Sequence, residues 1–358
     1  MKMARRDLLS NGAGLALSVL SSKSSLAAFS QIQVNGPLLP SNWQSINISA
    51  DGSKIFNPLW QGDYFNSQDT GASWISQTSL GKKQWVLGGC SSDGTVAYGA
   101  VQNGYLYKYS SGVWSQLPNQ PGSSVQNWQE IRCSSDGTKV VAIVGSISQG
   151  DIWTSVDGGT TWVDQTGALT RNWTACDISG DGTKIIASNW LGQGPNGDGG
   201  VYISTNWQSG SPTWASNIFA ANGAIFAGGV CYSRDGSTAY CAFNANGSTS
   251  IIYVTQNDGA TWTPASPPVG GGNARSWNDV HCNSTGEVVV GVGYAAINNA
   301  WLSTNYGASG SWTNLPIIGG GWSALSDNGQ VIAVSTYGGY INISQNGGST
   351  FQVAQVHG

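Results

Sequence analysis

A few charged residues of this sequence alternate with apolar residues in short segments. Glu130 and Arg132 do so in WQEIRC, Asp279 and His281 do so in WNDVHC, and Asp177 occurs in the similar stretch WTACDI. Because alternate residues of a strand point to the same face, each of these pairs should share one face. Paired carboxylates can supply the proton donor and the base or nucleophile of glycoside cleavage, or they can hold a polar ligand.

The same residues also have a structural interpretation. Unpaired charges in a crowded inner strand would destabilise the fold by several kcal/mol each, so they should pair or meet water. Glu130, Arg132 and Asp177 could therefore form a satisfied ion-pair cluster that joins neighbouring parts of the fold. The functional alternative joins them with Asp279 and His281 in an acid/base or ligand-binding group. Both interpretations stay open, because the sequence does not give the separation of the carboxylates.

A repeat positions these residues. Seven segments share an apolar residue or Cys, usually Ser, a variable residue, an Asp-like residue and Gly: ISADG, CSSDG twice, ISGDG, YSRDG, CNSTG and LSDNG. Their Asp-like residues, spaced 42 to 54 residues apart, are Asp51, Asp93, Asp136, Asp181, Asp235, Thr285 and Asn328. Asp-Gly between two apolar runs predicts a hairpin turn. The spacing is the length of one four-stranded propeller blade.

A second repeat alternates with the first and occurs as SQDTGASW, SVDGGTTW, TQNDGATW and SQNGGSTF, with looser copies in the other three blades. Its carboxylate or amide residues are Asp69, Asp157, Asn257 and Asn346. We expect their side-chain oxygens to cap a tight turn, the Gly to take a positive φ, and the aromatic residue to pack inward. Seven copies cannot all be active sites, so the motif is interpreted as structural.

This second motif resembles the Asp-box, or BNR repeat, of the sialidase-like superfamily. The resemblance implies an all-β, seven-bladed β-propeller with four antiparallel strands per blade. It also implies a ligand site around the central axis, on the face opposite the Asp-boxes. Photosystem II assembly factor-like and xyloglucanase-like propellers have related patterns. The early Phe/Tyr-Arg-Ile-Pro motif of true sialidases is absent from this sequence, which argues against sialidase chemistry.

The site predictions follow from this placement. If the protein is an enzyme, the catalytic candidates are Glu130, Asp279, Asp177 and His281; the ligand-binding candidates are Arg132, Arg171, Arg275, Trp60 and Trp190. The two Trp residues are expected at strand ends, where each could stack on a flat ligand or simply cover a hydrophobic contact between loops. Cys231 and Cys241 flank one hairpin symmetrically and are a candidate disulfide. No residue spacing indicates a metal or cofactor site.

The first 27 residues have the pattern of an export signal, with basic residues, a modestly apolar stretch and then small residues. Arg5 and Arg6 followed by Asp7, Leu8 and Leu9 resemble a twin-arginine signal, and an ordinary secretion signal is the alternative. We expect 1–27 as signal peptide, 28–40 as an N-terminal extension and 41–358 as the propeller, in a periplasmic or extracellular protein. Gln31 to Val34 are a candidate strand for closing the ring.

The amino-acid composition argues against some classes of binding partner. The chain has 358 residues with 51 Gly, 17 Trp and only 9% charged residues, which suits a turn-rich β protein. Its formal net charge is −4, and removal of 1–27 would make it more negative. Such a surface does not favour nucleic acid or anionic lipid, so we expect neither nucleic-acid binding nor membrane insertion of the mature chain.

We therefore expect an exported monomer that binds a glycan or a protein ligand at the axial mouth opposite the Asp-boxes, without a cofactor. The first alternative is a glycan-active hydrolase or lyase that uses the axial carboxylates. The second alternative is an assembly or scaffolding factor. The family resemblance specifies the fold far more closely than the activity.

Overall fold

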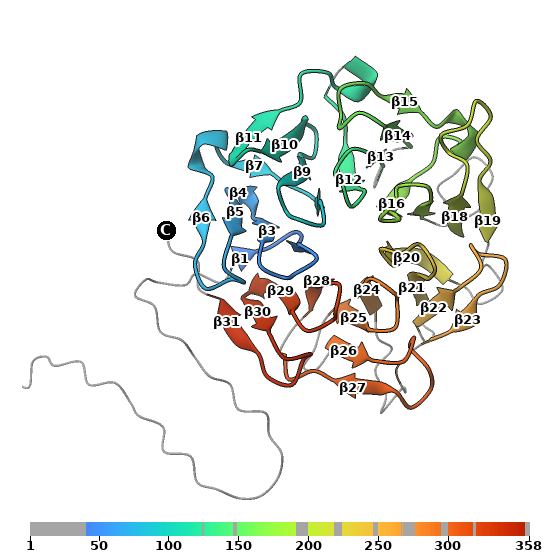
Figure 1. The fold of residues 1–358 in the computed structure, drawn as a ribbon. Helices are drawn as coiled ribbons and strands as arrows, with labels where there is room; N and C mark the ends of the chain where they lie inside the picture. Colours follow the sequence, from blue (N-terminus) through green and yellow to red (C-terminus); the bar gives the residue numbers. More distant parts are fainter. Residues whose placement is uncertain are drawn as a thin grey trace, which may run out of the picture.

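The computed structural model describes residues 41–358 apart from 124, 146–148, 191–199, 218–223, 246–249, 266, 268–275, 295–299, 318–319 and 355–358. The predicted signal peptide, the extension at 28–40 and the strand candidate at 31–34 therefore lie outside the described residues. Seven antiparallel sheets stand around a central axis, each with the four strands of one blade, and the seventh sheet has one additional short strand (Figure 1). The predicted all-β, seven-bladed propeller is confirmed.

The first three blades each run in chain order from the innermost to the outermost strand. Blade 1 contains β2 (Asn47–Ile48), β3 (Ile55–Pro58), β5 (Tyr64–Ser67) and β6 (Ile75–Ser76). Blade 2 contains β8 (Gly89–Cys90), β9 (Val96–Ala100), β10 (Leu106–Ser110) and β11 (Val113–Gln116). Blade 3 contains β12 (Trp128–Cys133), β13 (Val140–Val144), β14 (Ile152–Ser155) and β15 (Val163–Asp164).

The other four blades have the same order. Blade 4 contains β16 (Trp173–Ile178), β17 (Ile185–Asn189), β18 (Gly200–Ser204) and β19 (Ala215–Asn217). Blade 5 contains β20 (Ala224–Tyr232), β21 (Ala239–Ala245), β22 (Ile251–Thr255) and β23 (Thr263–Pro264). Blade 6 contains β24 (Ser276–Cys282), β25 (Val289–Tyr294), β26 (Ala300–Ser303) and β27 (Trp312–Asn314). Blade 7 contains β28 (Gly321–Leu325), β29 (Ile332–Gly339), β30 (Ile341–Ser344) and β31 (Gln352–Ala354).

A few short elements lie outside the blades. β4 (Trp60–Gly62) pairs with β7 (Lys83–Gln84), and three one-turn 3₁₀ helices span Thr78–Leu80, Pro121–Ser123 and Thr166–Ala168. Among the described residues, no helix has the length and apolar character needed to cross a membrane.

The propeller ring is closed by β1 (Ser41–Asn42), which pairs with the far end of β29 in blade 7. The indole of Trp43 strengthens this closure, because its Nε1 donates to the carbonyl of Gly339 at 3.1 Å. Ile46 of blade 1 also packs in one apolar cluster with Ala333 and Ile341 of blade 7. The first and last blades are thereby joined by both hydrogen bonds and apolar contact.

The Asp-like residues of the first repeat hold the turn between strands one and two of their blades. In six blades the Oδ1 atom accepts the backbone N–H two residues later; the residues are Asp51, Asp93, Asp136, Asp181, Asp235 and Asn328. In blade 6 the hydroxyl of Thr285 accepts the N–H of Glu287 at a longer 3.3 Å. The predicted hairpin turns are present in every blade.

The second repeat holds the turn between strands three and four. Asp157 Oδ1 accepts the N–H of Thr161 at 2.8 Å, and Ser155 Oγ accepts the N–H of Gly159, whose φ is +86°. Trp162 Nε1 donates back to the Gly159 carbonyl at 3.1 Å. The same acceptor bond is made in blades 1, 5 and 7 by Asp69, Asn257 and Asn346. These oxygens have the predicted structural role in their turns.

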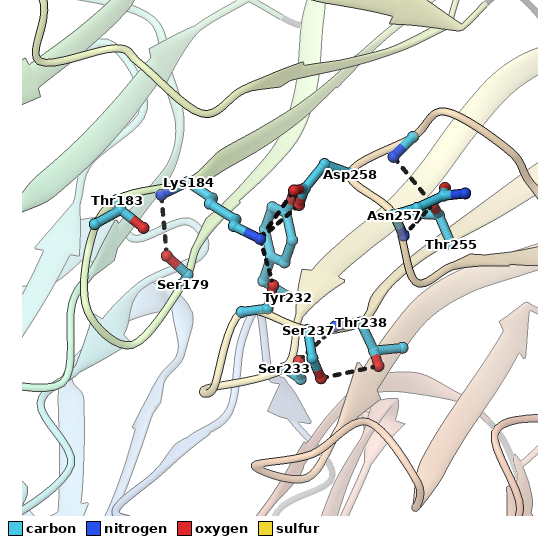
Figure 2. A network of polar contacts seen from close by, with 12 residues as sticks. Ser179, Thr183, Lys184, Tyr232, Ser233, Ser237, Thr238, Thr255, Asn257 and Asp258 are labelled. Atoms are coloured by element: carbon cyan, nitrogen blue, oxygen red, sulfur yellow. Dashed lines mark hydrogen bonds and ion pairs between the residues drawn. The ribbon is translucent and has the colours of Figure 1, made fainter.

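Both kinds of turn lie at the same end of an antiparallel four-stranded blade, which we call the turn face; the opposite end is the loop face. Figure 2 shows how blades 4 and 5 are joined at the turn face by Lys184. Its Nζ donates to the Gly236 carbonyl in the first turn of blade 5 at 2.9 Å. It also donates to Asp258 in the second turn of that blade at 2.7 Å.

Near the axis on the turn face, backbone hydrogen bonds run around the whole ring. The seven donor N–H groups belong to Ala50, Ser92, Ser135, Gly180, Asp235, Ser284 and Asp327. Each donates to a carbonyl in the next blade, and the N–H of Asp327 returns to the carbonyl of Ala50. Innermost strands have one unpaired edge, so this hydrogen-bonded ring uses some of the groups that the sheets leave free.

Candidate functional site

A cavity of about 170 Å³ lies around the axis at the loop-face ends of the innermost strands. Its lining follows the repeat, because residues six and seven places before the Asp-like position contribute in most blades. The residues are Gln44, Val86, Leu87, Gln129, Glu130, Thr174, Ala175, Gly228, Gly229, Asn278, Asp279 and Trp322, together with Val230 and Arg132. The predicted axial mouth opposite the second-repeat turns therefore coincides with a hollow.

Glu130 and Arg132 form a buried ion pair at the inner end of this cavity. Arg132 Nη2 lies 2.6 Å and Nε lies 2.8 Å from Glu130 Oε1, and Arg132 Nη1 donates to Asn47 Oδ1 in blade 1 at 2.8 Å. Glu130 Oε2 accepts the backbone N–H of Cys176 in blade 4 at 2.7 Å. Burial raises the pKa of Glu130 to about 7, although Arg132 and the Cys176 N–H oppose that shift. The pair thus ties blades 1, 3 and 4 together.

Asp279 and His281 form a second pair, on the opposite side of the axis. His281 Nδ1 lies 3.2 Å from Asp279 Oδ2, which also accepts the N–H of Ser323 in blade 7 at 2.7 Å. Burial alone would raise the pKa of Asp279, but His281, the Ser323 N–H and Arg132 outweigh it and hold this pKa below its usual value. Asp279 is therefore an anion at neutral pH.

Asp177 contacts the next blade in the same way as Glu130 and Asp279 do. Its Oδ2 accepts the N–H of Tyr232 in blade 5 at 2.8 Å, and its Oδ1 accepts the N–H of Ile178 at 2.9 Å. Each of the three acidic residues predicted near the axis therefore binds a backbone N–H on the innermost strand of the next blade. Such N–H groups face the channel rather than a sheet partner, so a carboxylate acceptor stabilises them.

A smaller chamber of about 100 Å³ lies farther along the axis, toward the turn face. Arg132, Asp177 and His281 lie on its wall, as do the three thiol-bearing residues Cys90, Cys133 and Cys282. Arg132 lines both hollows, so its ion pair separates the loop-face cavity from the chamber. At the turn face, the side chains of Arg234 and Asp327 complete the wall.

The structure brings only some of the predicted residues together. Glu130, Arg132 and Asp279 line the loop-face cavity, whereas Asp177 and His281 line the chamber. Arg171 is 5% exposed, its guanidinium lies 4.6 Å from the ring centre of Tyr202, and its Nε donates to the Ala168 carbonyl. This packing accounts for Arg171 without a ligand.

The two predicted Trp contacts also lie outside the lining of both hollows. Trp60 is half-buried in β4 and packs against the apolar cluster between blades 2 and 3. The backbone N–H of Trp190 donates to the Asn172 carbonyl at 3.0 Å. Arg275 lies outside the described residues.

Five polar and aromatic residues of the lining were not among the predicted site residues. They are Gln44, Gln129, Thr174, Asn278 and Trp322, and all five side chains are half-buried. Four of them occupy place seven before the Asp-like residue and Trp322 occupies place six, so the repeat register would have identified them. All five side chains are neutral, whereas the lining residues that were predicted, Glu130, Arg132 and Asp279, are charged.

The predicted disulfide between Cys231 and Cys241 is wrong, because both thiols are free. The prediction assumed that Cys231 and Cys241 lie opposite each other across the hairpin. The strand register instead pairs Cys231 with Tyr240 and Cys241 with Val230, a shift of one residue. A shift of one residue places the two side chains on opposite faces of the sheet. Cys231 packs toward blade 6 and Cys241 toward blade 4. Among the described residues, no group of three or more His, Cys, Asp or Glu side chains could hold a metal ion.

Comparisons with known proteins show the fold. No family model and no curated protein matches the sequence. The GH74 xyloglucanase from Xanthomonas campestris is similar in structure, with a TM-score of 0.64 and 11% identity over 89% of this chain. This chain spans about half, 55%, of that xyloglucanase.

Two other solved structures are similar over nearly their whole length. YCF48 bound to D1 peptide has a TM-score of 0.55 and 14% identity over 89% of this chain and 93% of that chain. Kuenenia stuttgartiensis hydrazine synthase has a TM-score of 0.61 and 12% identity over 87% of this chain and 97% of that chain. Because these proteins differ in what they do, the similarity shows a common seven-bladed propeller architecture and no shared activity.

Proposed function

We propose that this protein is a binding protein that holds a polar ligand, a glycan or a segment of another protein, in the loop-face cavity. The observation that carries the proposal is the lining of that cavity. Half-buried amide side chains from Gln129 and Asn278 and the indole of Trp322 surround a hollow of about 170 Å³. The amide nitrogens of Asn278 and Gln129 donate to the carbonyls of Gly321 and Trp128, so their oxygens are the groups offered to a ligand. Amide oxygens beside an aromatic ring form a common recognition surface for sugars and for peptide backbone.

The engagement of the carboxylates favours binding over catalysis. Both Glu130 oxygens already accept hydrogen bonds, one from Arg132 and one from a backbone N–H. Asp279 Oδ2 likewise accepts from Ser323 and contacts His281, while its Oδ1 accepts no hydrogen bond from a described residue. A general acid and base need a proton that can move to or from the substrate, and these contacts restrain both groups.

The fold neighbours support both ligand classes. One neighbour is a xyloglucanase and another was solved with a bound peptide. A titration of tryptophan fluorescence with a panel of neutral oligosaccharides and with extended peptides tests the proposal directly. We expect saturable binding that Trp322→Phe and Gln129→Ala weaken at least tenfold. Trp60→Phe is the matched control, because it changes a Trp outside the cavity, and it should bind like the wild type.

Turnover would overturn the binding-only proposal. If the wild type cleaves any oligosaccharide of the panel, and Glu130→Gln or Asp279→Asn abolishes cleavage while circular dichroism stays unchanged, the protein is a glycan-active hydrolase or lyase. If the oligosaccharides neither bind nor react, and a partner protein binds the wild type but not Trp322→Phe, the assembly-factor alternative is correct.

We further infer that residues 1–27 direct export and that the second repeat is an Asp-box. The sequence of 1–27 supports export, and the turns at Asp69, Asp157, Asn257 and Asn346 support the Asp-box assignment. N-terminal sequencing of the protein from a fractionated host should give a chain that begins near residue 28. Sedimentation of that mature chain should give the mass of a monomer; a cytosolic, uncleaved chain would contradict the export proposal.

A further inference from the structure

The six cysteines differ in their surroundings, and two of them meet across a blade interface. Cys231, the penultimate residue of β20, and Cys282, the last residue of β24, have their Sγ atoms 3.6 Å apart. Both belong to the apolar cluster between blades 5 and 6. Cys241 packs on the other face of blade 5, in the cluster it shares with blade 4.

We propose that Cys231 and Cys282 form a disulfide that joins blade 5 to blade 6 when the protein meets a small oxidant. A disulfide has a sulfur–sulfur bond of about 2.05 Å, so the two sulfurs must approach by roughly 1.5 Å. Rotation about the Cα–Cβ bonds can supply that movement. β20 and β24 already pack against each other, so the two residues start on neighbouring strands.

The two thiols have different access to an oxidant. Cys282 lines the axial chamber, whereas Cys231 is fully buried. Burial raises the pKa of Cys231, and its contact with Cys282 adds to that shift, so Cys231 stays protonated at neutral pH. The first attack on an oxidant therefore comes from Cys282, and Cys231 resolves the product.

Hydrogen peroxide is an oxidant of suitable size, because a chamber of about 100 Å³ holds only a few molecules the size of water. In the first step the Cys282 thiol and peroxide give a sulfenic acid and one water. In the second step the Cys231 sulfur attacks the sulfenic sulfur, the S–O bond breaks, and a second water leaves with the Cys231 proton. The two thiols lose two electrons in total, and these reduce the peroxide.

The positions of Lys and Arg allow tryptic peptides to show which two cysteines a disulfide joins. Cleavage after Lys and Arg places Cys231 in peptide 185–234, Cys241 in 235–275 and Cys282 in 276–358. Cys90, Cys133 and Cys176 fall in 84–108, 133–139 and 172–184. Every cysteine is thus on a different peptide, and any linked pair identifies its two residues without ambiguity.

The experiment treats the purified, folded chain with hydrogen peroxide, blocks remaining thiols with N-ethylmaleimide and maps tryptic peptides by mass spectrometry without reduction. We expect 185–234 linked to 276–358, and loss of that species after reduction. Cys241→Ser is the matched control and should keep the link. Cys231→Ser and Cys282→Ser should each abolish it.

Thermal unfolding gives an independent readout. A crosslink between residues 51 positions apart restricts the unfolded chain, so the oxidised wild type should unfold about 5 °C higher than the reduced form. Cys282→Ser should show no such difference.

A second sample is refolded from denaturant in peroxide, to give the oxidant access before the blades close. Full alkylation of Cys231 and Cys282 in both samples would overturn the proposal, as would a link between Cys282 and any peptide other than 185–234. The proposal does not depend on ligand binding.

Discussion

Arg234 of blade 5 binds Asp327 of blade 7 across the propeller axis, with Nε donating to Oδ1 at 2.6 Å. The same guanidinium donates from Nη1 to Ser92 Oγ in blade 2 at 2.7 Å. The Arg234 side chain therefore lies across the turn-face mouth and joins blade 5 to blades 2 and 7. An ammonium group could not match this contact, because only the planar guanidinium has separate donors aimed at both partners.

Loss of this bridge should lower stability modestly. Both side chains are partly exposed, so we expect Arg234→Met to reduce the free energy of unfolding by about 1–2 kcal/mol. Urea unfolding followed by tryptophan fluorescence measures the change. Arg234→Lys should reduce the free energy of unfolding by nearly as much as Arg234→Met. A lysine variant as stable as the wild type would show that charge alone, rather than the forked geometry, accounts for the contribution.

Asp157→Ala should destabilise the fold without affecting ligand binding. The substitution removes the acceptor for the N–H of Thr161, and loss of a comparable cap costs about 1 kcal/mol. Asp157→Asn is the informative control, because Asn257 and Asn346 make the equivalent bond in blades 5 and 7. It should be close to the wild type in a thermal melt, whereas equal losses in both variants would argue against the turn-capping role.

Acid should destabilise the protein through its turn carboxylates. Burial opposes the shift, but hydrogen bonds from Thr161, Ser155 and Thr160 lower the pKa of Asp157 to about 2 in the folded state. The unfolded chain has the ordinary, higher pKa. The stabilisation is therefore fully present above the unfolded value and is lost as pH falls through the folded one. Between about pH 5 and pH 2, the melting temperature of Asp157→Asn should fall less steeply than that of the wild type. Parallel curves would refute this linkage.

Glu130→Gln should be far more damaging than a change at an exposed glutamate. It leaves the guanidinium of Arg132 buried without its ion-pair partner, and breaking such a pair typically costs about 3–5 kcal/mol. Glu287 is exposed and provides a matched Glu→Gln control that should stay within about 0.5 kcal/mol of the wild type. Chemical unfolding of the two variants side by side measures the difference in their free energies of unfolding. Similar small losses would mean that the pair does not hold blades 1, 3 and 4 together.

The sequence was sufficient to predict the fold because each blade repeats the same local chemistry. The Asp-Gly turns and the second-repeat turns each close a hairpin through contacts within a few residues, so their spacing predicts seven blades. The buried Trp85, Trp128, Trp173 and Trp277 also follow from the register, since all stand eight places before an Asp-like residue. Information of this kind is local and needs no knowledge of other blades.

Contacts between blades were harder to predict. Besides Arg132, Glu130 binds a backbone N–H in the next blade, and the partners of Arg234 lie 93 and 142 residues away. The incorrect disulfide prediction shows the same limit. A one-residue difference in strand register separates Cys231 from Cys241, and the packing of blade 5 on blade 6 places Cys231 beside Cys282. Such pairings depend on the relative placement of strands that the repeat pattern does not give.

The ring of backbone hydrogen bonds on the turn face has a consequence for folding. Open repeat arrays unfold progressively from their ends, because the terminal repeats contact only one neighbour. Here each blade donates to one neighbour and accepts from the other, and the bond from Asp327 to Ala50 leaves no terminal blade. Loss of any blade would break two links instead of one. The molecule should therefore unfold as a single cooperative unit, even though its architecture is a simple series of repeats.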